Sequence, residues 1–195
     1  MLYQIDQNGK NTWVTYVREC LCHYGYACVW NNQGVGDVNS FIHCFKERII
    51  DCRWQDWHSH INNSDRYSHY CQFKTNHCME PYMHLSMNRY VVKALVYFRL
   101  GISSIVVHSQ RYKENANNMS TACRLCNTGI ENEVHIMLCC EKLRVLRNDL
   151  LPVKYYRFPN VFKLNLLLAN QNEKIVQNLA LYLYKTLKML EHASS

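Results

Sequence analysis

Glycine and proline are scarce in this chain of 195 residues, which contains six glycines and three prolines. This scarcity argues against a β-sandwich, which needs many tight turns, and against a disordered linker. No stretch approaches the roughly 18 consecutive apolar residues of a membrane-spanning helix, so we expect no membrane partner. The hydrophobic content of 48% and the charged content of 19% are those of a globular protein. The length suits one domain, or one domain with a small satellite.

A secretory leader is also lacking, since the first eight residues have neither a basic start nor an apolar run. The cysteines number eleven, an odd count that does not suit a framework of disulfides. Together these features predict an intracellular protein, nuclear or cytoplasmic, whose thiols are reduced.

Signatures of an enzyme are missing as well. Gly34 and Gly36 lack the third glycine of a phosphate-binding loop and precede no strand–helix unit. No two aspartates lie close together in an apolar strand, as a two-metal polymerase would need. No nucleophile signature accompanies the cysteines. The sequence therefore predicts a protein that is not an enzyme and has no small-molecule substrate.

Helical periodicity, in contrast, is present almost throughout. Apolar spacing predicts helices over 13–24, from a cap at Asp37 or Asn39 to about 60, over 67–74, 87–99, 141–151 and 160–168, and from 170 onwards. The β-branched run 102–107 is a candidate strand. The predicted buried stripes include Phe41, Ile42, Phe45, Ile49 and Cys52, and the aromatic residues Trp13, Trp54, Trp57, Tyr90, Tyr97 and Tyr182. The predicted fold class is mainly α.

Four residues in the last third of the chain form the pattern C-x2-C-x8-H-x4-C: Cys123, Cys126, His135 and Cys140. Three thiolates and one imidazole are a complete tetrahedral ligand set for a structural Zn²⁺. The spacing favours Cys140 as the fourth ligand, with the adjacent Cys139 as the alternative. Four protein ligands leave no position for water or substrate. We therefore predict a small zinc knuckle embedded in a helical domain.

The alternative interpretation is that these cysteines are ordinary buried thiols. A chain with eleven cysteines and ten histidines matches some metal spacings by chance. Other fragments, such as His77 with Cys78, lack four ligands at a local spacing. The completeness of the local ligand set favours zinc at the four-residue pattern.

Positive charge is concentrated after residue 60. The balance is −1 over residues 1–60, +4 over 61–122, zero over 123–150 and +4 over 151–195. Basic residues beside a zinc module are typical of polyanion binding. We expect single-stranded RNA or DNA to contact Arg111, Lys113 and Arg124, with Tyr155 and Tyr156 as stacking surfaces. The alternative is that the charge serves solubility alone.

Residues 123–147 resemble the carboxy-terminal cysteine–histidine knuckle of non-LTR retrotransposon reverse transcriptases. The shared pattern has two cysteines, an acidic stretch before the histidine, apolar residues after it, a final cysteine and an arginine shortly beyond. Residues 98–101 with Arg111 are similar to the segment that precedes this knuckle. Parts of 13–37 are similar to the linker after the polymerase in invertebrate elements. Within this resemblance only the knuckle is specific.

The resemblance implies three regions: 1–107, similar to the post-polymerase linker; 108–151, the zinc knuckle and following helix; and 152–195, the carboxy-terminal helices. The family is an RNA-directed DNA polymerase, but its catalytic aspartates and endonuclease have no counterpart here. The resemblance therefore implies a non-catalytic part that binds RNA or target DNA for a polymerase encoded elsewhere. Two alternatives stay open: a zinc-stabilised structural or protein-interaction module, and a decayed element fragment with no present activity.

Overall fold

The computed structural model describes residues 13–64, 67–110 and 121–193. Helices dominate these residues, whose only β-pairing is an isolated bridge between Ala122 and Ile130, so the prediction of a mainly α protein is confirmed. Contacts divide the chain into two compact units, Met1–His60 and Ile61–Ser195. The boundaries inferred from the sequence, after 107 and after 151, both fall inside the second unit. No helix in the described ranges is long and apolar enough to cross a membrane.

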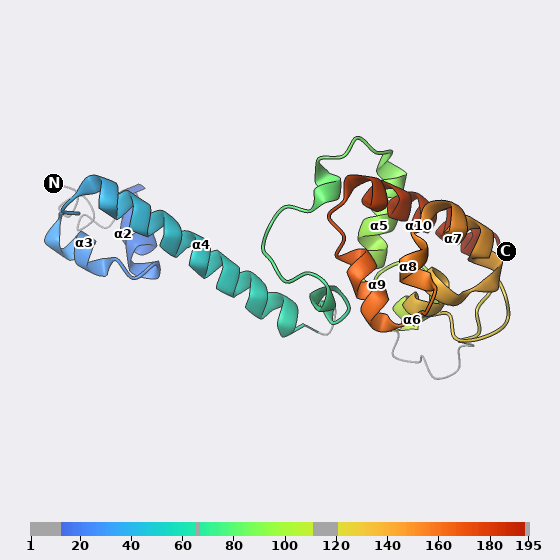
Figure 1. The fold of residues 1–195 in the computed structure, drawn as a ribbon. Coiled ribbons are helices and arrows are strands. Elements are labelled where there is room, and N and C mark those ends of the chain that lie inside the picture. The colour runs from blue at the N-terminus through green and yellow to red at the C-terminus, as the bar shows by residue number, and fades with distance from the viewer. Residues whose placement is uncertain (1–12, 65–66, 111–120, 194–195) are drawn as a thin grey trace. The chain divides into compact units, whose positions relative to one another are not determined.

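The described part of the first unit consists of α2 (Trp13–His23), α3 (Ala27–Asn32) and most of α4 (Val38–Asn62) (Figure 1). Val14, Leu21 and Trp30 form its buried core. The Oδ1 of Asp37 accepts a hydrogen bond from the Ser40 N–H at 2.7 Å and caps α4. The predicted start of this helix is therefore confirmed.

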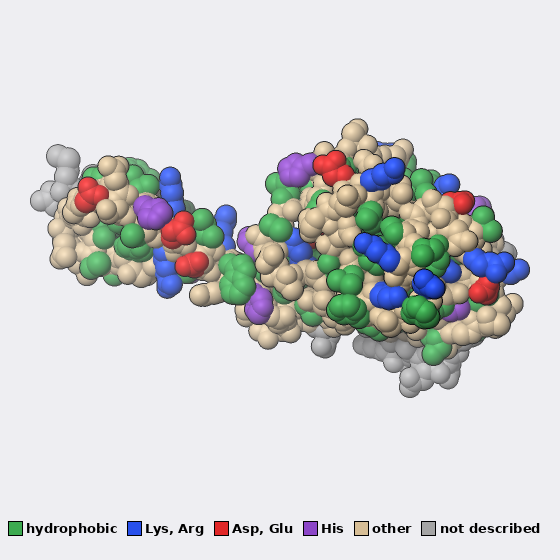
Figure 2. Space-filling view, in the orientation of Figure 1, with side chains coloured by type: hydrophobic (Ala, Val, Ile, Leu, Met, Phe, Trp, Pro, Cys, Tyr) green, Lys and Arg blue, Asp and Glu red, His purple; other side chains and the backbone are tan. Residues whose placement is uncertain are grey.

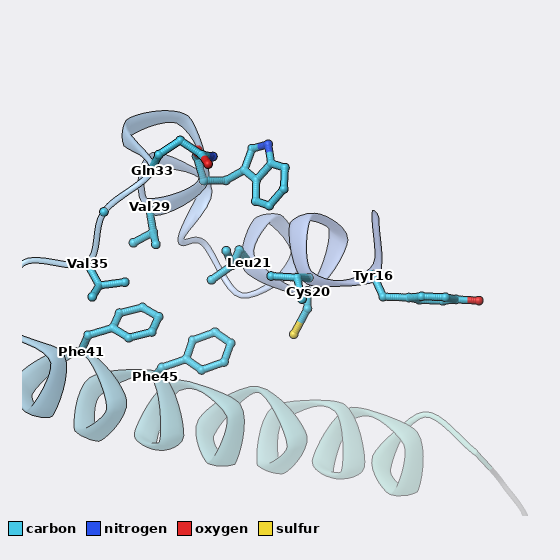
Figure 3. A pocket seen from close by; sticks show the side chains of 11 residues that line it. Tyr16, Cys20, Leu21, Val29, Gln33, Val35, Phe41 and Phe45 are labelled. Carbon is cyan, nitrogen blue, oxygen red and sulfur yellow. The ribbon is translucent and has the colours of Figure 1, made fainter. Parts of the chain in front are cut away.

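An apolar pocket of about 700 Å³ lies within this unit, where Phe41 and Phe45 of α4 face α2 and α3 (Figure 3). The prediction of a buried stripe along α4 is wrong, because Ile42 is exposed and the other four residues are only half-buried. The physical reason is length. The helices α2 and α3 have 11 and 6 residues and cannot cover a helix of 25.

The second unit is built around α5 (Arg89–Arg99) and α10 (Glu173–His192), which pack side by side (Figure 1). The shorter elements are η2 (Tyr70–Gln72), η3 (Pro81–Met83), α6 (Val106–Gln110), the π-helical η5 (His135–Cys139), η6 (Glu141–Leu143), α7 (Arg144–Leu150), α8 (Val153–Tyr156) and α9 (Val161–Leu168). Buried side chains from most of these elements form one core, whose fully buried members include Phe98, Ile105, Ile136, Met137, Leu164, Leu179, Tyr182 and Leu183.

Tertiary contacts override several local predictions in this unit. Residues 102–107 are not a strand, because Ile105 is buried in the core and Val106 begins α6. Residues 67–74 contain a 3₁₀ turn in place of the predicted helix. Helix α10 starts later than predicted, because the Asn172 side chain accepts the Ile175 N–H at 3.2 Å and caps it there. Helices α7 and α9 lie where the periodicity predicts them.

Most of the aromatic residues predicted in buried stripes are not buried. Tyr182 is fully buried and Trp57 is half-buried, whereas Trp13, Trp54, Tyr90 and Tyr97 are exposed. Helical spacing predicts the face of a helix on which a residue lies, but not whether another element covers that face.

Candidate metal centre

Cys123 and Cys126 lie on one tight turn. The Asn127 N–H donates to the Cys123 carbonyl at 2.8 Å, and the Cys123 N–H donates to the Gly129 carbonyl at 3.0 Å. Gly129 has a left-handed backbone with φ of 74°. A Cβ at this position would lie 3.2 Å from Nδ1 of His135. The glycine therefore allows both the turn and the close approach of the imidazole.

His135 and Cys140 come from a helical segment that begins after Asn132. The Asn132 side chain accepts the His135 N–H at 2.8 Å. From His135 the segment is π-helical, and the Cys140 N–H donates to the His135 carbonyl at 2.7 Å. In an α-helix, residues five positions apart differ by about 140° around the axis. The wider π turn instead brings Cys140 round to the side of His135.

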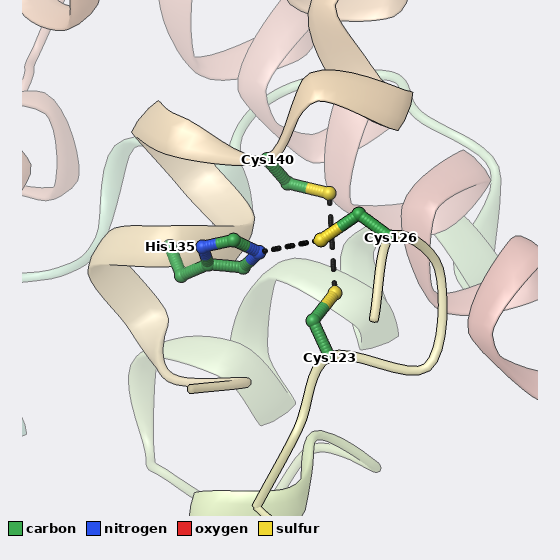
Figure 4. Close-up of side chains that lie close together, drawn as sticks. All are labelled: Cys123, Cys126, His135 and Cys140. Atoms are coloured by element: carbon green, nitrogen blue, oxygen red, sulfur yellow. Dashed lines mark hydrogen bonds between the residues drawn. The ribbon is translucent and has the colours of Figure 1, made fainter. Parts of the chain in front are cut away.

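The two segments bring all four predicted ligands together. The Sγ atoms of Cys123, Cys126 and Cys140 and the imidazole of His135 lie within 4.8 Å of one another (Figure 4). Cys123 Sγ is 3.9 Å from Cys140 Sγ, and Cys126 Sγ is 3.3 Å from His135 Nε2. Cys139 does not belong to this group. The arrangement is one in which three sulfurs and one nitrogen can hold a metal ion.

The three thiols differ in acidity. Burial raises the pKa of Cys123, and burial together with the charge of Cys123 raises the pKa of Cys140 to about 12. Burial acts in the same direction on Cys126, but hydrogen bonds from Thr128 outweigh it and lower the pKa of Cys126 to about 6. The Thr128 hydroxyl donates to the Cys126 sulfur at 3.1 Å. At neutral pH one thiol is therefore ionised, and two keep protons that a cation would displace.

The carboxylate of Glu131 is fully buried and holds the turn that carries Cys123 and Cys126 by accepting hydrogen bonds. It accepts the backbone N–H of Arg124 at 2.9 Å and the Arg124 Nε–H at 3.0 Å. It also accepts the Val106 N–H at 3.0 Å at the start of α6. The Arg124 guanidinium donates further to the Ser104 carbonyl at 2.7 Å. The sequence did not predict this role, although Glu131 belongs to the acidic stretch of the knuckle pattern.

Arg147 and Tyr182 hold the other side of the centre. Arg147 is buried and donates to the carbonyls of Met137 at 3.0 Å and Cys140 at 2.7 Å. The Tyr182 hydroxyl donates to the Ile136 carbonyl at 2.7 Å. These bonds satisfy carbonyl groups in and next to the π-helical turn. Periodicity placed Tyr182 in the core, but no sequence signal indicated this hydrogen bond.

A buried hydrogen-bonded chain of Ser103, His108 and Glu133 adjoins the helical segment that carries His135. The Nδ1 of His108 accepts the Ser103 backbone N–H at 3.3 Å, so the proton is on Nε2, which donates to Glu133 at 3.0 Å. Burial opposes ionisation of Glu133, but the bond from His108 outweighs it and lowers the pKa of Glu133 to about 2. All three side chains are buried. We infer that these hydrogen bonds connect residues 103–108 to the segment that carries His135.

Three of the five predicted nucleic-acid contacts, Arg124, Tyr155 and Tyr156, lie in the part of the chain that the structure describes. Arg111 and Lys113 lie outside the described residues. The donors of Arg124 are used by Glu131 and Ser104, as described above. Tyr155 is buried, and its hydroxyl accepts a hydrogen bond from the Asn170 side chain at 2.7 Å. Tyr156 is half-buried, with the Arg147 guanidinium 5.9 Å from its ring centroid. The Tyr155 ring is therefore not open for stacking, whereas the Tyr156 ring is partly exposed.

Compared with known proteins, the chain matches no family model, no curated protein and no solved structure. The resemblance to reverse transcriptases therefore rests on the residues of the knuckle pattern. What the centre can do has to be inferred from its own geometry.

Proposed function

We propose that Cys123, Cys126, His135 and Cys140 bind one Zn²⁺ as a structural ion. In a tetrahedral site with Zn–S of about 2.3 Å and Zn–N of about 2.0 Å, two sulfurs lie about 3.8 Å apart, and a sulfur and a nitrogen about 3.5 Å apart. Two of the six corresponding distances are 3.9 Å, between the Cys123 and Cys140 sulfurs, and 3.3 Å, between Cys126 Sγ and His135 Nε2, and all six are within 4.8 Å. This near agreement is the observation that supports the proposal.

The ligand chemistry supports zinc over calcium and magnesium. Thiolates and imidazoles are preferred by zinc, whereas calcium and magnesium prefer oxygen ligands. Four protein ligands complete the tetrahedral coordination of zinc, which leaves no open position at which to activate water. In this proposal the ion joins the cysteine turn to the π-helical segment and takes no part in a reaction.

The unit that contains this centre is, in our proposal, a non-catalytic module that binds single-stranded RNA or DNA. Residues 61–195 carry seventeen Lys and Arg against nine Asp and Glu, whereas residues 1–60 carry five against six. The positive charge thus belongs to the unit with the four-ligand cluster, and phosphate backbones bind such surfaces. The resemblance to the carboxy-terminal region of reverse transcriptases agrees with this role, with the polymerase encoded elsewhere.

The second candidate is a structural or protein-interaction module. A decayed fragment without activity would, like that module, not bind nucleic acid. The observation that favours an interaction module is the apolar pocket of about 700 Å³ in the first unit. In that case zinc would stabilise the second unit and its positive charge would serve solubility alone.

Salt-dependent binding distinguishes these candidates. The zinc-loaded 195-residue protein would be titrated into fluorescently labelled single-stranded RNA and DNA, and the anisotropy would be followed from low to physiological salt. For about three to five phosphate contacts we expect a log–log slope of roughly −2 to −3.5. An absence of binding even at low salt would favour the interaction module or the decayed fragment.

A further inference from the structure

The surface of α8 and α9 combines exposed apolar side chains with basic ones. We call it the α8–α9 face. Its exposed apolar residues are Val153, Phe158, Val161, Phe162 and Leu166, and its basic residues are Lys154, Arg157 and Lys163. Phe158 and Phe162 are the most exposed apolar members, at 67% and 70%. Large aromatic side chains left this open to solvent mark a candidate interaction surface.

The charge of this face has one sign. Residues 150–172 contain no Asp or Glu, although they include three basic residues. In Figure 2, Lys and Arg side chains lie next to hydrophobic ones over the region of α8 and α9. A partner that fits this face must therefore offer negative charge together with flat or apolar groups.

The arrangement around Phe158 adds a geometric requirement. The Arg157 guanidinium lies 5.6 Å and the Lys163 ammonium 5.3 Å from the centroid of the Phe158 ring. Two cations thus adjoin one exposed aromatic ring. A single-stranded nucleic acid has the matching chemistry, because its unpaired bases stack on aromatic rings while its phosphates pair with neighbouring cations.

We propose that the α8–α9 face is where single-stranded nucleic acid binds, an inference that rests on the nucleic-acid-binding function proposed above. Bases stack on Phe158 and Phe162, and phosphates contact Lys154, Arg157 and Lys163. These rings take the place of Tyr155, which the fold buries, and they are more exposed than the half-buried Tyr156. Duplex binds less well, because its paired bases are already stacked on one another and cannot reach the rings.

An anionic membrane would also offer negative charge, but the face suits it less. Membrane-surface helices bury a continuous apolar side over several turns. Helix α8 has only 4 residues and α9 has 8. Of the apolar residues of α9, Leu164, Leu167 and Leu168 are already buried in the protein core.

Two variants test the stacking and the phosphate contacts separately. In the first, Phe158→Ala and Phe162→Ala remove the rings. In the second, Lys154→Gln, Arg157→Gln and Lys163→Gln remove the charges. The matched control is Lys142→Gln, Lys174→Gln and Lys185→Gln, three exposed residues outside this face that lower the net charge equally. All substituted side chains except Lys163 are exposed, so we expect unchanged zinc content and circular dichroism.

Binding of the 195-residue protein and its variants to a labelled single-stranded oligonucleotide is then measured over a range of salt concentrations. We expect the phenylalanine variant to bind at least about tenfold more weakly with an unchanged salt slope, because stacking involves no counterions. We expect the charge variant to flatten the slope by about 2. The control should lose less affinity than either and keep a steeper slope than the charge variant.

Each other outcome overturns the assignment in a distinguishable way. If the wild type binds and both variants behave like the control, the function stands but the face is wrong. If the wild type binds no oligonucleotide at low salt, both proposals fail. If it binds vesicles of anionic lipid in a manner that depends on the two phenylalanines, but no oligonucleotide, the face is a membrane surface.

Discussion

At the scale of single residues, the π-helical turn decides which of two adjacent cysteines can face the cluster. The hydrogen bond from the Cys140 N–H to the His135 carbonyl places Cys140 beside the imidazole, while Cys139 does not join the group. We therefore expect Cys139→Ser to retain zinc and Cys140→Ser to lose it. Elemental analysis of the two purified variants makes the comparison, and the reverse result would reassign the fourth ligand to Cys139.

Gly129 is the second residue on which the centre depends. Gly129→Ala should lower stability by about 1 kcal/mol through its left-handed backbone. It should also weaken zinc binding by about tenfold, because the added methyl displaces His135. Gly36→Ala is the matched control, since Gly36 has φ of 68° but nothing within 4 Å of a built Cβ.

Competition with a chromophoric chelator measures the zinc affinity of both glycine variants, and denaturant unfolding measures their stability. If the Gly129→Ala and Gly36→Ala variants bind zinc equally well, the position of the His135 ring does not require a glycine at residue 129.

Zinc binding should release protons at neutral pH. The pKa of Cys123 is raised and that of Cys140 is raised to about 12, so both thiols are protonated in the metal-free chain. The pKa of Cys126 is about 6, so it is already ionised. About two protons should leave per zinc at pH 7, and affinity should rise as pH rises because fewer protons compete. Calorimetry in buffers of different ionisation enthalpy counts them; zero protons would contradict this assignment.

The cluster of three cysteines and one histidine could be predicted from the sequence because its members are local. Two ligand pairs at short spacing specify a site with little help from the rest of the chain. The roles of the supporting residues could not be predicted, because the contacts of Glu131, Arg147 and His108 depend on the tertiary fold. Tyr155 shows the opposite error. Its aromatic and basic neighbours in the sequence predicted an exposed stacking surface, but the fold buries its ring.

At the scale of elements, Arg147 of α7 should be the most sensitive support of the π-helical turn. Arg147→Leu leaves the carbonyls of Met137 and Cys140 without their donor in a buried setting, so we expect a loss of about 2–4 kcal/mol of unfolding free energy. Arg144→Leu, on the exposed side of the same helix, should change it by less than about 0.5 kcal/mol. Denaturant unfolding of zinc-loaded protein measures both, and equal effects would contradict the role of Arg147.

The positions of the helices could be predicted from the sequence more closely than the faces that they bury. Local caps define helix starts, as Asp37 does for α4 and Asn160 does for α9. The run 102–107 shows why a short apolar segment is ambiguous, since Ile105 is buried in the way a strand residue would be. The exposed length of α4 shows that periodicity alone does not provide a packing partner.

At the scale of the whole molecule, the two units differ in charge and in the kind of candidate site that they contain. The positive charge and the four residues that could hold a metal both belong to residues 61–195, whereas residues 13–60 provide an apolar pocket. The charge division could be counted from the sequence. The boundary at residue 60 could not be predicted, because α4 continues across it without a break.

One structural zinc ion, in our proposal, joins Cys123, Cys126, His135 and Cys140. Elemental analysis tests this on the 195-residue protein prepared with zinc under reducing conditions, beside its Cys123→Ser and Cys126→Ser variants. We predict one zinc per wild-type chain and none in either variant. A wild-type chain without zinc, or variants that bind as much as the wild type, would contradict the claim.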